Sequence, residues 1–296
     1  MKKLIFKFQN KNLIKPKRVI VLGTSGIISV NLQKKLKKHN VKFIKIGKKN
    51  IDFKKKKSIQ FLRKKIKDGD FIVFISAEAP AKNLKMKKNN IYICKNICSA
   101  LVKKNIQNLI YISSDAVYSD TRKKIKENSL TKPNSIHGKM HLQREKILKK
   151  HFNNNFCIIR PTLVYGPGDT HLGYGPNRFI KLALKKKEIS LFGNGEERRD
   201  HIYIDDLISI LYKCILFNAV GTINAITGKI YSFLEIAELT NKISKNNSSI
   251  TKSKRVGPMP HNGYRPFENS LLKNYFKELK IKKMKDGIKH YISQIK

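Results

Sequence analysis

Acidic residues are scarce in this chain of 296 residues. Asp and Glu together number 20 against 64 Lys and Arg, which gives a formal net charge of +44. A field of that sign attracts polyanions. The lysines are spread along the whole chain, however, and no recognition module for nucleic acid is visible. We therefore expect no specific nucleic-acid partner, and we expect the field to help draw in an anionic small substrate.

Cysteine and long apolar runs are scarce as well. The four cysteines have neither the CxxC spacing of zinc sites nor the pattern of a secreted disulfide framework, so we expect buried free thiols at Cys94, Cys98, Cys157 and Cys214. No apolar run approaches the length of a membrane span. The apolar start, Leu4–Phe6, is too short for a signal peptide. The sequence thus predicts a cytoplasmic protein without a membrane span, in which residues 1–17 form an extension before the first strand.

Short apolar runs that alternate with helical patterns fill the first half of the chain. Buried strands are predicted at Val19–Leu22, Asp70–Ala77, Leu109–Ser114 and Phe156–Arg160, and a helix at Leu84–Lys104. This alternation is typical of a parallel sheet covered on both faces. After Pro161 the glycine and proline content rises and the elements shorten. We predict the α/β class, with a Rossmann-type doubly wound sheet over residues 18–165. A smaller C-terminal substrate-binding lobe follows over residues 166–296, with segments that return to the sheet.

A glycine loop joins the first of these strands to the following helix. In the run Gly23-Thr-Ser-Gly26-Ile-Ile-Ser29, Gly23 allows a tight turn and Gly26 lets the backbone approach a pyrophosphate at the helix N-terminus. Ser29 stands where such loops have a third glycine, and it is small enough to pack there. The context of strand, turn and helix makes this loop a dinucleotide-binding signal.

The end of the second strand bears on the choice between NAD and NADP. An acidic residue there would bind the ribose 2′-hydroxyl. This chain has Gly47, Lys48 and Lys49 instead, which favours a 2′-phosphate, while Asp52 comes slightly later and is a candidate for the adenosine. Lysine fills almost every loop of the sequence, so NAD or NADP stays open.

Five segments in the right order resemble the extended short-chain dehydrogenase/reductase family of nucleotide-sugar enzymes, the NAD-dependent epimerase/dehydratase family that includes UDP-glucose 4-epimerase. The resemblance covers nearly the whole chain from Arg18. The segments are NIYICKNICSAL (Asn90–Leu101), SSDAVYSD (Ser113–Asp120), RPTLVYGPGD (Arg160–Asp169), ISLFGNGEERRDHIYIDDL (Ile189–Leu207) and INAITGKIYSFLEIA (Ile223–Ala237). The loop and the resemblance together imply a cofactor site made of Gly23, Ser25, Gly26, Ile27, Lys48, Asp52, Ala77 and Asn90.

The resemblance also bears on the stretch HGKMHLQREKIL (His137–Leu148). The family has Tyr-Gly-x-x-Lys there, so His137 falls on the tyrosine and His141 on the lysine, and Ser114 falls on the catalytic Ser/Thr. An unperturbed Tyr needs roughly 4 kcal/mol of differential stabilisation to bring its pKa from ~10 to about 7. A histidine with a pKa near ~6.5 needs no such help.

Three interpretations of the histidine pair stay open. In the first, His137 is the general acid/base, Ser114 binds the reacting oxygen and neutral His141 contacts the nicotinamide ribose. Imidazole is shorter than phenol, so a bridging water can be needed. In the second, the protein binds nucleotide but its dehydrogenase chemistry is altered or lost. In the third, both histidines and an outside carboxylate bind a metal. The resemblance explains the helix without a metal, so we predict none.

The substrate side follows from the same resemblance. Arg199 and Arg265 are expected to clamp a diphosphate, because a guanidinium binds phosphate oxygens bidentately. Asn177 falls on a substrate-binding position and Phe192 beside the nucleotide base. Glu78 follows a strand and is expected to face the cofactor or substrate. The alternatives are a solvated loop carboxylate for Glu78, and structural ion pairs with Asp200, Asp205 or Asp206 for the two arginines.

These observations predict an NAD(P)-dependent epimerase or oxidoreductase that acts on a nucleotide-diphosphate sugar, and we expect it to serve surface polysaccharide synthesis. Dehydration is disfavoured, because Ala116 stands where sugar dehydratases of the family have an acid. The alternative is an inactive or altered nucleotide-binding relative that acts as a sensor or partner subunit. The resemblance further implies a homodimer through the helices Leu84–Lys104 and His137–Lys150.

Overall fold

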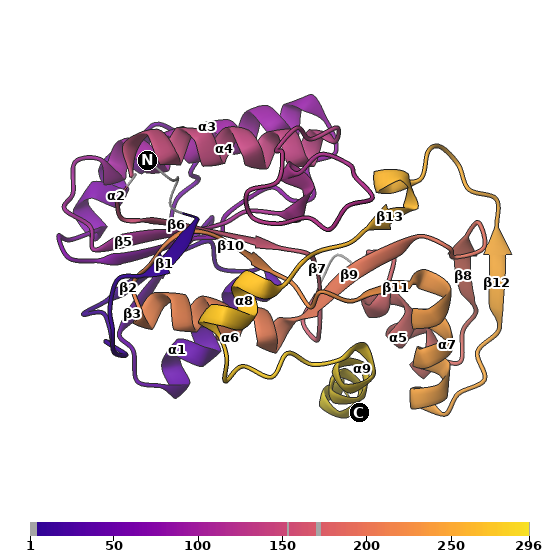
Figure 1. Ribbon diagram of the computed structural model, residues 1–296. Helices are drawn as coiled ribbons and strands as arrows, with labels where there is room; N and C mark the ends of the chain where they lie inside the picture. The colour runs from indigo at the N-terminus through magenta and orange to yellow at the C-terminus, as the bar shows by residue number, and fades with distance from the viewer. Residues whose placement is uncertain (1–4, 153, 170–172, 296) are drawn as a thin grey trace. The chain divides into compact units, whose positions relative to one another are not determined.

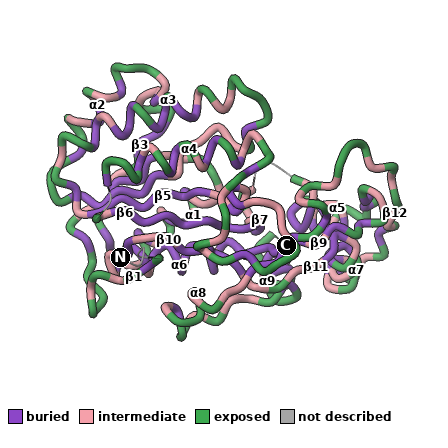
Figure 2. The backbone as a smooth tube through the Cα atoms, turned by 45° about the horizontal axis from the view of Figure 1, so that its top comes forward, coloured by how far each residue is buried: buried purple, intermediate pink, exposed green. Residues whose placement is uncertain are grey.

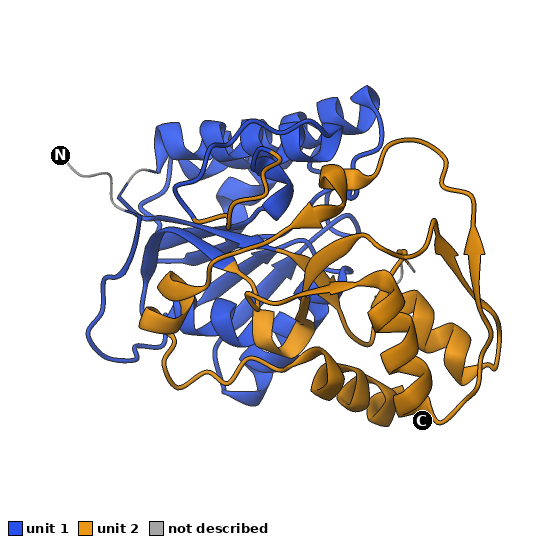
Figure 3. Cartoon of the chain, turned by 45° about the vertical axis from the view of Figure 1, so that its right-hand side comes forward, with its two compact units in different colours: residues 1–119, 127–161, 208–224 blue, residues 120–126, 162–207, 225–296 orange. Residues whose placement is uncertain are grey.

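The computed structural model describes residues 5–152, 154–169 and 173–295, and the chain forms two compact units (Figure 3). Unit 1 comprises residues 1–119, 127–161 and 208–224, and unit 2 comprises residues 120–126, 162–207 and 225–296. The start of the predicted extension, residues 1–4, lies outside the described residues. The predicted domain boundaries at 17/18 and 165/166 stay a prediction.

A large, mainly parallel sheet forms the centre of unit 1, with the strand order β1-β10-β6-β5-β4-β2-β3. Strands β3, β2, β4, β5 and β6 pair in parallel. Among them, β2, β4, β5 and β6 are the apolar runs predicted from the sequence, and each is buried along its whole length. The strands are β1 (Phe6–Phe8), β2 (Val19–Leu22), β3 (Phe43–Ile46), β4 (Phe71–Phe74), β5 (Asn108–Ile112), β6 (Phe156–Pro161) and β10 (Ala219–Ala225).

Helices cover both faces of this sheet, which confirms the predicted fold class (Figure 1). Helices α2, α3 and α4 lie on one face, and α1 with residues 208–216 of α6 lies on the other. The purple strands and inner helix faces of Figure 2 mark the apolar core, to which α3 contributes Cys94, Ile97 and Leu101. The bounds are α1 (Ile27–Lys38), α2 (Lys57–Lys65), α3 (Leu84–Leu101), the 3₁₀ turn η1 (Asp115–Val117), α4 (Ile136–His151) and α6 (Ile204–Leu216).

Strand β1 is a feature that the sequence patterns do not predict. It pairs antiparallel with β10, although its residues were expected to form an extension before the sheet. Phe6 is buried, and the ring of Phe8 stacks on Phe217 at a centroid distance of 4.7 Å. A strand of three residues gives too short an alternating pattern to be detected from sequence.

A buried ion pair fastens α4 to β6. The Glu145 carboxylate accepts two hydrogen bonds from the Arg160 guanidinium, at 2.9 and 2.6 Å, and a third from Ser113 Oγ at 2.5 Å. Arg160 also donates to the Tyr118 hydroxyl at 2.9 Å. Glu145 therefore has a structural role, and its place on the face of α4 that also carries His141 is explained without a metal.

Unit 2 is built on a small sheet of strand order β11-β9-β13, with β7 paired to β9, and on the separate parallel pair β12–β8. Helix α7 begins with a capping box between Ser232 and Glu235, which satisfies two backbone N–H groups at once. The bounds are β7 (Leu163–Tyr165), α5 (Pro176–Leu184), β8 (Ile189–Phe192), β9 (Arg198–Tyr203), β11 (Ile230–Ser232), α7 (Phe233–Ser244), β12 (Ile250–Ser253), η2 (Pro260–Gly263), β13 (Tyr264–Arg265), α8 (Ser270–Tyr275) and α9 (Met284–Ile295). Across the described residues, no helix is both long and apolar enough to span a bilayer.

We predict that Arg160→Met destabilises the protein by about 3–5 kcal/mol, because it leaves the Glu145 carboxylate buried without its cation. Urea unfolding followed by far-UV circular dichroism measures the change. Arg198→Met is the matched control, since the Arg198–Glu235 pair is exposed and such pairs contribute at most about 1 kcal/mol. Equal losses in both variants would contradict the structural role of the buried pair.

Candidate active site

The glycine loop lies at the switch point of the unit 1 sheet, between β2 and β4. Gly23 has φ +112°, and a Cβ there would lie 2.7 Å from the Ser76 nitrogen at the end of β4. Gly26 is the N-cap of α1, and a Cβ placed on it would meet no protein atom within 4 Å. Ser29 donates a hydrogen bond of 2.5 Å to the Gly23 carbonyl, so its hydroxyl fixes the turn where a third glycine would only pack.

A cavity of about 380 Å³ opens beside this loop. The first turn of α1 holds no acidic residue and its N-cap makes no side-chain hydrogen bond, so the positive end of the helix dipole faces the loop without internal competition. The lining brings together most of the predicted cofactor residues, with Glu78 beside them: Gly23, Ser25, Gly26, Lys48, Asp52, Ala77 and Glu78. Ile27, the first residue of α1, and Asn90 are not in the lining.

Glu78 belongs to a charged cluster on the wall of this cavity. It accepts hydrogen bonds from Lys54 Nζ at 3.1 Å and from Asn89 Nδ2 at 2.9 Å. Burial raises the pKa of Glu78, but the hydrogen bonds from Asn89 and Lys54 outweigh it, and the pKa lies below its ordinary value. Glu78 is therefore a paired anion at neutral pH. Its side chain is partly exposed on the cavity wall, and its expected contact with the cofactor or substrate stays a prediction.

Asn90 shapes the loop that carries Glu78. Its buried amide accepts from the Glu78 N–H at 2.9 Å and donates to the Glu78 and Met86 carbonyls, each at 2.9 Å. All of these contacts are with the protein's own backbone. The structure thus places this predicted cofactor residue beneath the loop as a support.

Ser114 follows β5, the next strand along the same carboxyl edge of the sheet. Its hydroxyl accepts from the Ala116 N–H at 3.1 Å and is 3.3 Å from the Asp115 carboxylate, to which it donates. The first turn of α4 packs directly on this segment. Gly138 has no side chain and so allows this approach, since a Cβ there would collide with the Ala116 carbonyl. The close packing places Ser114 and the start of α4 side by side.

His137 is held at the start of α4 by a backbone contact. Its Nδ1 accepts a hydrogen bond of 3.3 Å from the Ala81 N–H. Burial lowers the pKa of His137 below its ordinary value, Asp115 opposes this change and Arg144 adds to it. The ring is therefore neutral at pH 7, and since Nδ1 accepts, its proton is on Nε2.

His141 lies one turn further along α4 and is buried. Its Nδ1 is 2.7 Å from the Tyr111 hydroxyl, and its ring meets that of His137 edge to face at a centroid distance of 4.6 Å. Burial, with smaller contributions from His137 and Arg144, holds the pKa of His141 well below its ordinary value. Burial also raises the pKa of Tyr111, so the phenol keeps its proton.

Arg144 is a site residue that the sequence patterns did not single out. It is fully buried on the same face of α4, with its guanidinium 4.4 Å from the Phe74 ring centroid and 5.0 Å from that of Tyr111. Its Nη2 donates to the Ser76 carbonyl at 2.7 Å. The signal was present in the sequence, since Met140, Arg144 and Leu148 are four residues apart in a stripe that has to be buried.

The two predicted substrate arginines lie in unit 2, and each has a carboxylate partner. Arg199 donates to Glu197 at 3.2 Å, and Arg265 donates to Asp120 at 3.1 Å. The alternative of structural ion pairs thus has support, although these partners differ from the expected Asp200, Asp205 and Asp206. Residues 197 and 199 share a face of the extended chain, whereas Asp200 points to the other face and binds Thr162, Thr227 and Gly228.

Asn177 and Phe192 also lie in unit 2. Asn177 is buried, accepts from the Gly166 N–H at 2.9 Å and donates to Asp169 at 2.6 Å, so it fastens the loop after β7. Phe192 is 43% exposed, and its ring meets that of Tyr174 at 4.6 Å. Of the two side chains, that of Phe192 is the exposed one.

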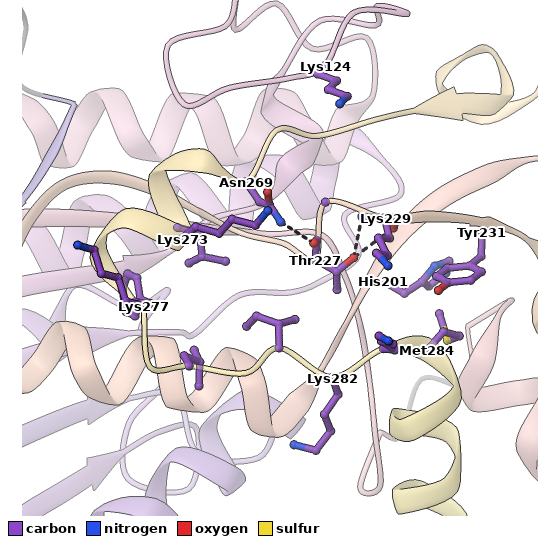
Figure 4. A pocket seen from close by; sticks show the side chains of 16 residues that line it. Lys124, His201, Thr227, Lys229, Tyr231, Asn269, Lys273, Lys277, Lys282 and Met284 are labelled. Atoms are coloured by element: carbon purple, nitrogen blue, oxygen red, sulfur yellow. Dashed lines mark hydrogen bonds between the residues drawn. The ribbon is translucent and has the colours of Figure 1, made fainter.

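A pocket of about 610 Å³ lies within unit 2, between the segments Thr227–Tyr231 and 276–284 (Figure 4). Its polar contacts are internal: Asn269 donates to the Thr227 carbonyl at 2.8 Å, and Lys282 pairs with Asp206 at 3.2 Å. Figure 4 shows the amines of Lys277 and Lys282 directed away from the pocket. The lining contains none of the predicted substrate residues Asn177, Phe192, Arg199 and Arg265.

The third interpretation of the histidine pair requires a metal ligand set. In the described ranges of the chain, no group of three or more His, Cys, Asp and Glu side chains is placed to hold a metal ion. The two rings pack edge to face, and their Nδ1 atoms contact the Ala81 N–H and the Tyr111 hydroxyl.

A known protein family matches more than half of this chain. The model of the NAD dependent epimerase/dehydratase family matches residues 19–225. The chain belongs to this family. It is 26% identical over 280 residues to the Uncharacterized UDP-glucose epimerase YtcB of Bacillus subtilis, covering 83% of this chain and 88% of that protein. It is 28% identical over 224 residues to ADP-L-glycero-D-manno-heptose-6-epimerase of Fusobacterium nucleatum, covering 67% and 64%. The resemblance inferred from the sequence is confirmed at the level of the family.

Solved structures show the same fold. UDP-glucuronic acid 4-epimerase from Bacillus cereus, in complex with UDP-glucuronic acid and NAD, superposes with a TM-score of 0.77 at 22% identity, covering 94% of this chain and 100% of that one. A GDP-L-fucose synthetase from Naegleria fowleri gives a TM-score of 0.82 at 15% identity, covering 98% and 97%.

We predict that Asn90→Leu lowers the free energy of unfolding by about 1–3 kcal/mol for each Glu78 backbone group that it leaves buried and unpaired. Asn89→Leu is the matched control on the same helix, because it removes only a contact with the partly exposed Glu78 carboxylate. Urea titration measures both variants. If Asn90→Leu were as stable as Asn89→Leu, the role of Asn90 as a support of this loop would be wrong.

Proposed function

We propose that this protein is an NAD(P)-dependent enzyme that epimerises or oxidises and reduces a nucleotide-diphosphate sugar, with His137 as its general acid/base. One observation carries the proposal. Strands β2, β4 and β5 are parallel, so the glycine-lined cavity after β2, Ser76 after β4 and Ser114 after β5 lie along one edge of the unit 1 sheet. The start of α4, with His137, packs on the Ser114 segment at that edge.

The cavity fits a dinucleotide by its shape and its donors. Gly23 and Gly26 leave the space that a pyrophosphate needs, and the N-terminus of α1 supplies backbone N–H groups. Ser25 and Ala77 would line the path of the cofactor, Ile27 would offer it a backbone N–H from the first turn of α1, and Lys48 and Asp52 would face its adenosine end. An exposed Lys48 suits a 2′-phosphate, and Asp52 suits a free 2′-hydroxyl, so both NAD and NADP are compatible with these side chains. When bound, the nicotinamide supplies hydride transfer at the sugar carbon.

The proton step belongs to His137. Neutral His137 can donate a hydrogen bond from Nε2 to a sugar oxygen while Nδ1 accepts from Ala81. To take the hydroxyl proton at Nε2, the ring first gives its Nε2 proton to water, accepts a proton from water at Nδ1 and gives up the Ala81 contact. The sugar O–H bond then breaks, its proton forms the new Nε2–H bond, and the ring becomes a cation. The imidazolium later returns this proton from Nε2 to the sugar oxygen, which forms the O–H bond again. Ser114 would turn its hydroxyl from Asp115 to the reacting oxygen, and His141 would stay a neutral neighbour.

The substrate would be held by unit 2. Arg199 and Arg265 are proposed to bind its diphosphate while each keeps a carboxylate partner. Phe192 is proposed to contact the base, and Asn177 to fix the loop after β7. The anionic charge of such a substrate suits the net charge of +44. A homodimer through α3 and α4 stays a proposal, and exposed apolar residues of α3 such as Leu84 and Tyr92 are consistent with it.

A second candidate function is nucleotide binding without turnover, as a sensor or partner subunit. The observation in its favour is that the Nδ1 atoms of both histidines are already engaged, by Ala81 and by Tyr111. NADH binding by the wild-type protein without turnover of any UDP-, GDP- or dTDP-sugar would support this candidate and contradict the first.

We predict that Gly26→Ala weakens NADH binding at least about tenfold, which corresponds to about 1.4 kcal/mol. The new methyl group meets no protein atom within 4 Å, so it projects into the space proposed for the pyrophosphate and leaves the fold intact. Cofactor fluorescence measures the affinity, and a thermal melt checks the fold. Gly173→Ala, which also adds a methyl group in open space, is the control. An unchanged NADH affinity in Gly26→Ala would exclude this loop as the cofactor site.

We predict that His137→Ala lowers kcat by about 10²–10⁴-fold on any nucleotide sugar that the wild type turns over, with NADH affinity unchanged. His151→Ala, at the exposed end of the same helix, is the control and should retain activity. Steady-state kinetics with UDP-, GDP- and dTDP-sugars measures both variants. Full activity of His137→Ala would remove this residue from the mechanism.

The same role predicts a pH profile. The base form of His137 is neutral, and burial and Arg144 together hold its pKa below the ordinary value near ~6.5. Activity should therefore be level above about pH 6.5 and fall only as the pH drops through the lowered pKa. A profile of kcat/KM against pH tests this, and an acid limb above about pH 7 would contradict it.

A further inference from the structure

Arg144 is a cation in the interior of unit 1 that has no carboxylate partner among the described residues. Its side chain is fully buried, and within the described part of the chain its Nε has no hydrogen-bond partner. Its other contacts are the Ser76 carbonyl at 2.7 Å and the Met140 sulfur at 3.9 Å. The rings of Phe74 and Tyr111 face the guanidinium and stabilise it through their π electrons. Neutral groups thus hold the charge, and its field is not cancelled by an adjacent carboxylate.

This cation connects the cofactor cavity with the histidine pair. On one side, Ser76 lines the cavity beside Gly23. On the other side, the Tyr111 ring lies 5.0 Å from the guanidinium, and the Tyr111 hydroxyl meets His141 at 2.7 Å. The His141 ring in turn packs on that of His137 at 4.6 Å. A continuous set of contacts therefore runs from the carboxyl end of β4 to the ring of His137.

We propose that Arg144 is a positioning residue whose fixed charge adds to the effect of burial in disfavouring a proton on His137 and His141, so that Nδ1 of His137 stays free to accept from the Ala81 N–H. A cation placed beside an imidazole disfavours a second positive charge on the ring. Neutral His137 can then accept from Ala81 at Nδ1 and donate at Nε2, whereas an imidazolium would lose the Ala81 contact. The electrostatic part stands on the structure alone, and its consequence for turnover rests on the proposed function.

Among the described residues, four other charged or titratable groups lie around His137 and His141, one on each of η1, β5, α3 and α4. Asp115 of η1 is the acid that opposes Arg144 at His137. Tyr111 of β5 is a neutral phenol, and Cys94 of α3, whose pKa is raised by burial, is a neutral thiol. Glu145 of α4 is neutralised by Arg160. Arg144 lowers the pKa of both rings, after the larger effect of burial and, for His141, after that of His137.

The test is a side-chain NMR titration of the histidines in the full-length protein without ligand. Arg144→Gln removes the charge and keeps a donor for the Ser76 carbonyl, and Arg144→Lys keeps the charge. Arg63→Gln is the matched control, because Arg63 also donates to a backbone carbonyl, that of Ser99 at 3.0 Å, on a different helix. We expect the titration midpoints of His137 and His141 to rise in Arg144→Gln by roughly one pH unit, a tenfold change in proton affinity. Arg144→Lys and Arg63→Gln should leave them within a few tenths of the wild type.

Unchanged midpoints in a folded Arg144→Gln variant would overturn the proposal. If Arg144→Gln does not fold, Arg144→Met, which also removes the charge, takes its place: midpoints raised by about one pH unit support the role of the charge, and unchanged midpoints refute it. These readouts need no activity, so they stand even if no nucleotide sugar is turned over and the proposed function fails. If turnover is found, the acid limb of kcat/KM should move to higher pH in Arg144→Gln by the same amount as the His137 midpoint.

Discussion

Two buried guanidinium groups fasten helix α4 to the sheet of unit 1. Arg160 of β6 binds Glu145 on the helix, and Arg144 on the helix binds the Ser76 carbonyl after β4. The contacts hold the helix from two strands, so its rotation and its height above the sheet are both fixed. Gly138 completes the arrangement by letting the first turn touch the Ala116 carbonyl. The positions of His137 and His141 depend on this attachment, and so does any chemistry proposed for them.

Of the two buried cations, Arg160 is paired with Glu145, whereas Arg144 is surrounded by neutral groups. A histidine that serves as an acid/base needs no nearby positive charge to act near neutrality, because its ordinary pKa is already close to 7. The nearby cation Arg144 has a different effect: together with burial, it lowers the pKa of both imidazoles and so disfavours their protonation. Among the anionic groups, Glu78 and Glu145 are each paired with a lysine or an arginine, whereas Asp115 opposes Arg144 at His137. The cavity beside the glycine loop presents lysines to a ligand together with the carboxylates of Asp52 and Glu78, and the N-terminus of α1 adds backbone N–H groups.

The sequence predicts this fold well because its parallel strands are buried on both faces and form continuous apolar runs. It predicts the glycine loop because only glycine tolerates φ +112° against Ser76. It does not predict β1, because a strand of three residues is too short to show the alternation of buried and exposed side chains. Partners of the polar residues were harder to predict. Arg265 meets Asp120, which is 145 positions away, and Asn90 and Asn177 bind backbone groups that only the fold brings near. The buried position of Arg144 was not predicted, because a single basic residue is not distinctive in a sequence with 64 Lys and Arg.

The central claim is that a neutral imidazole of His137, protonated on Nε2, stands beside the bound cofactor. The ¹⁵N chemical shifts of its ring, recorded at about pH 7 with and without saturating NADH, test this most directly. The account predicts an unprotonated Nδ1 and a protonated Nε2 in the free protein, with both resonances displaced when NADH is added. A doubly protonated ring at that pH, or resonances that do not respond to bound NADH, would contradict it.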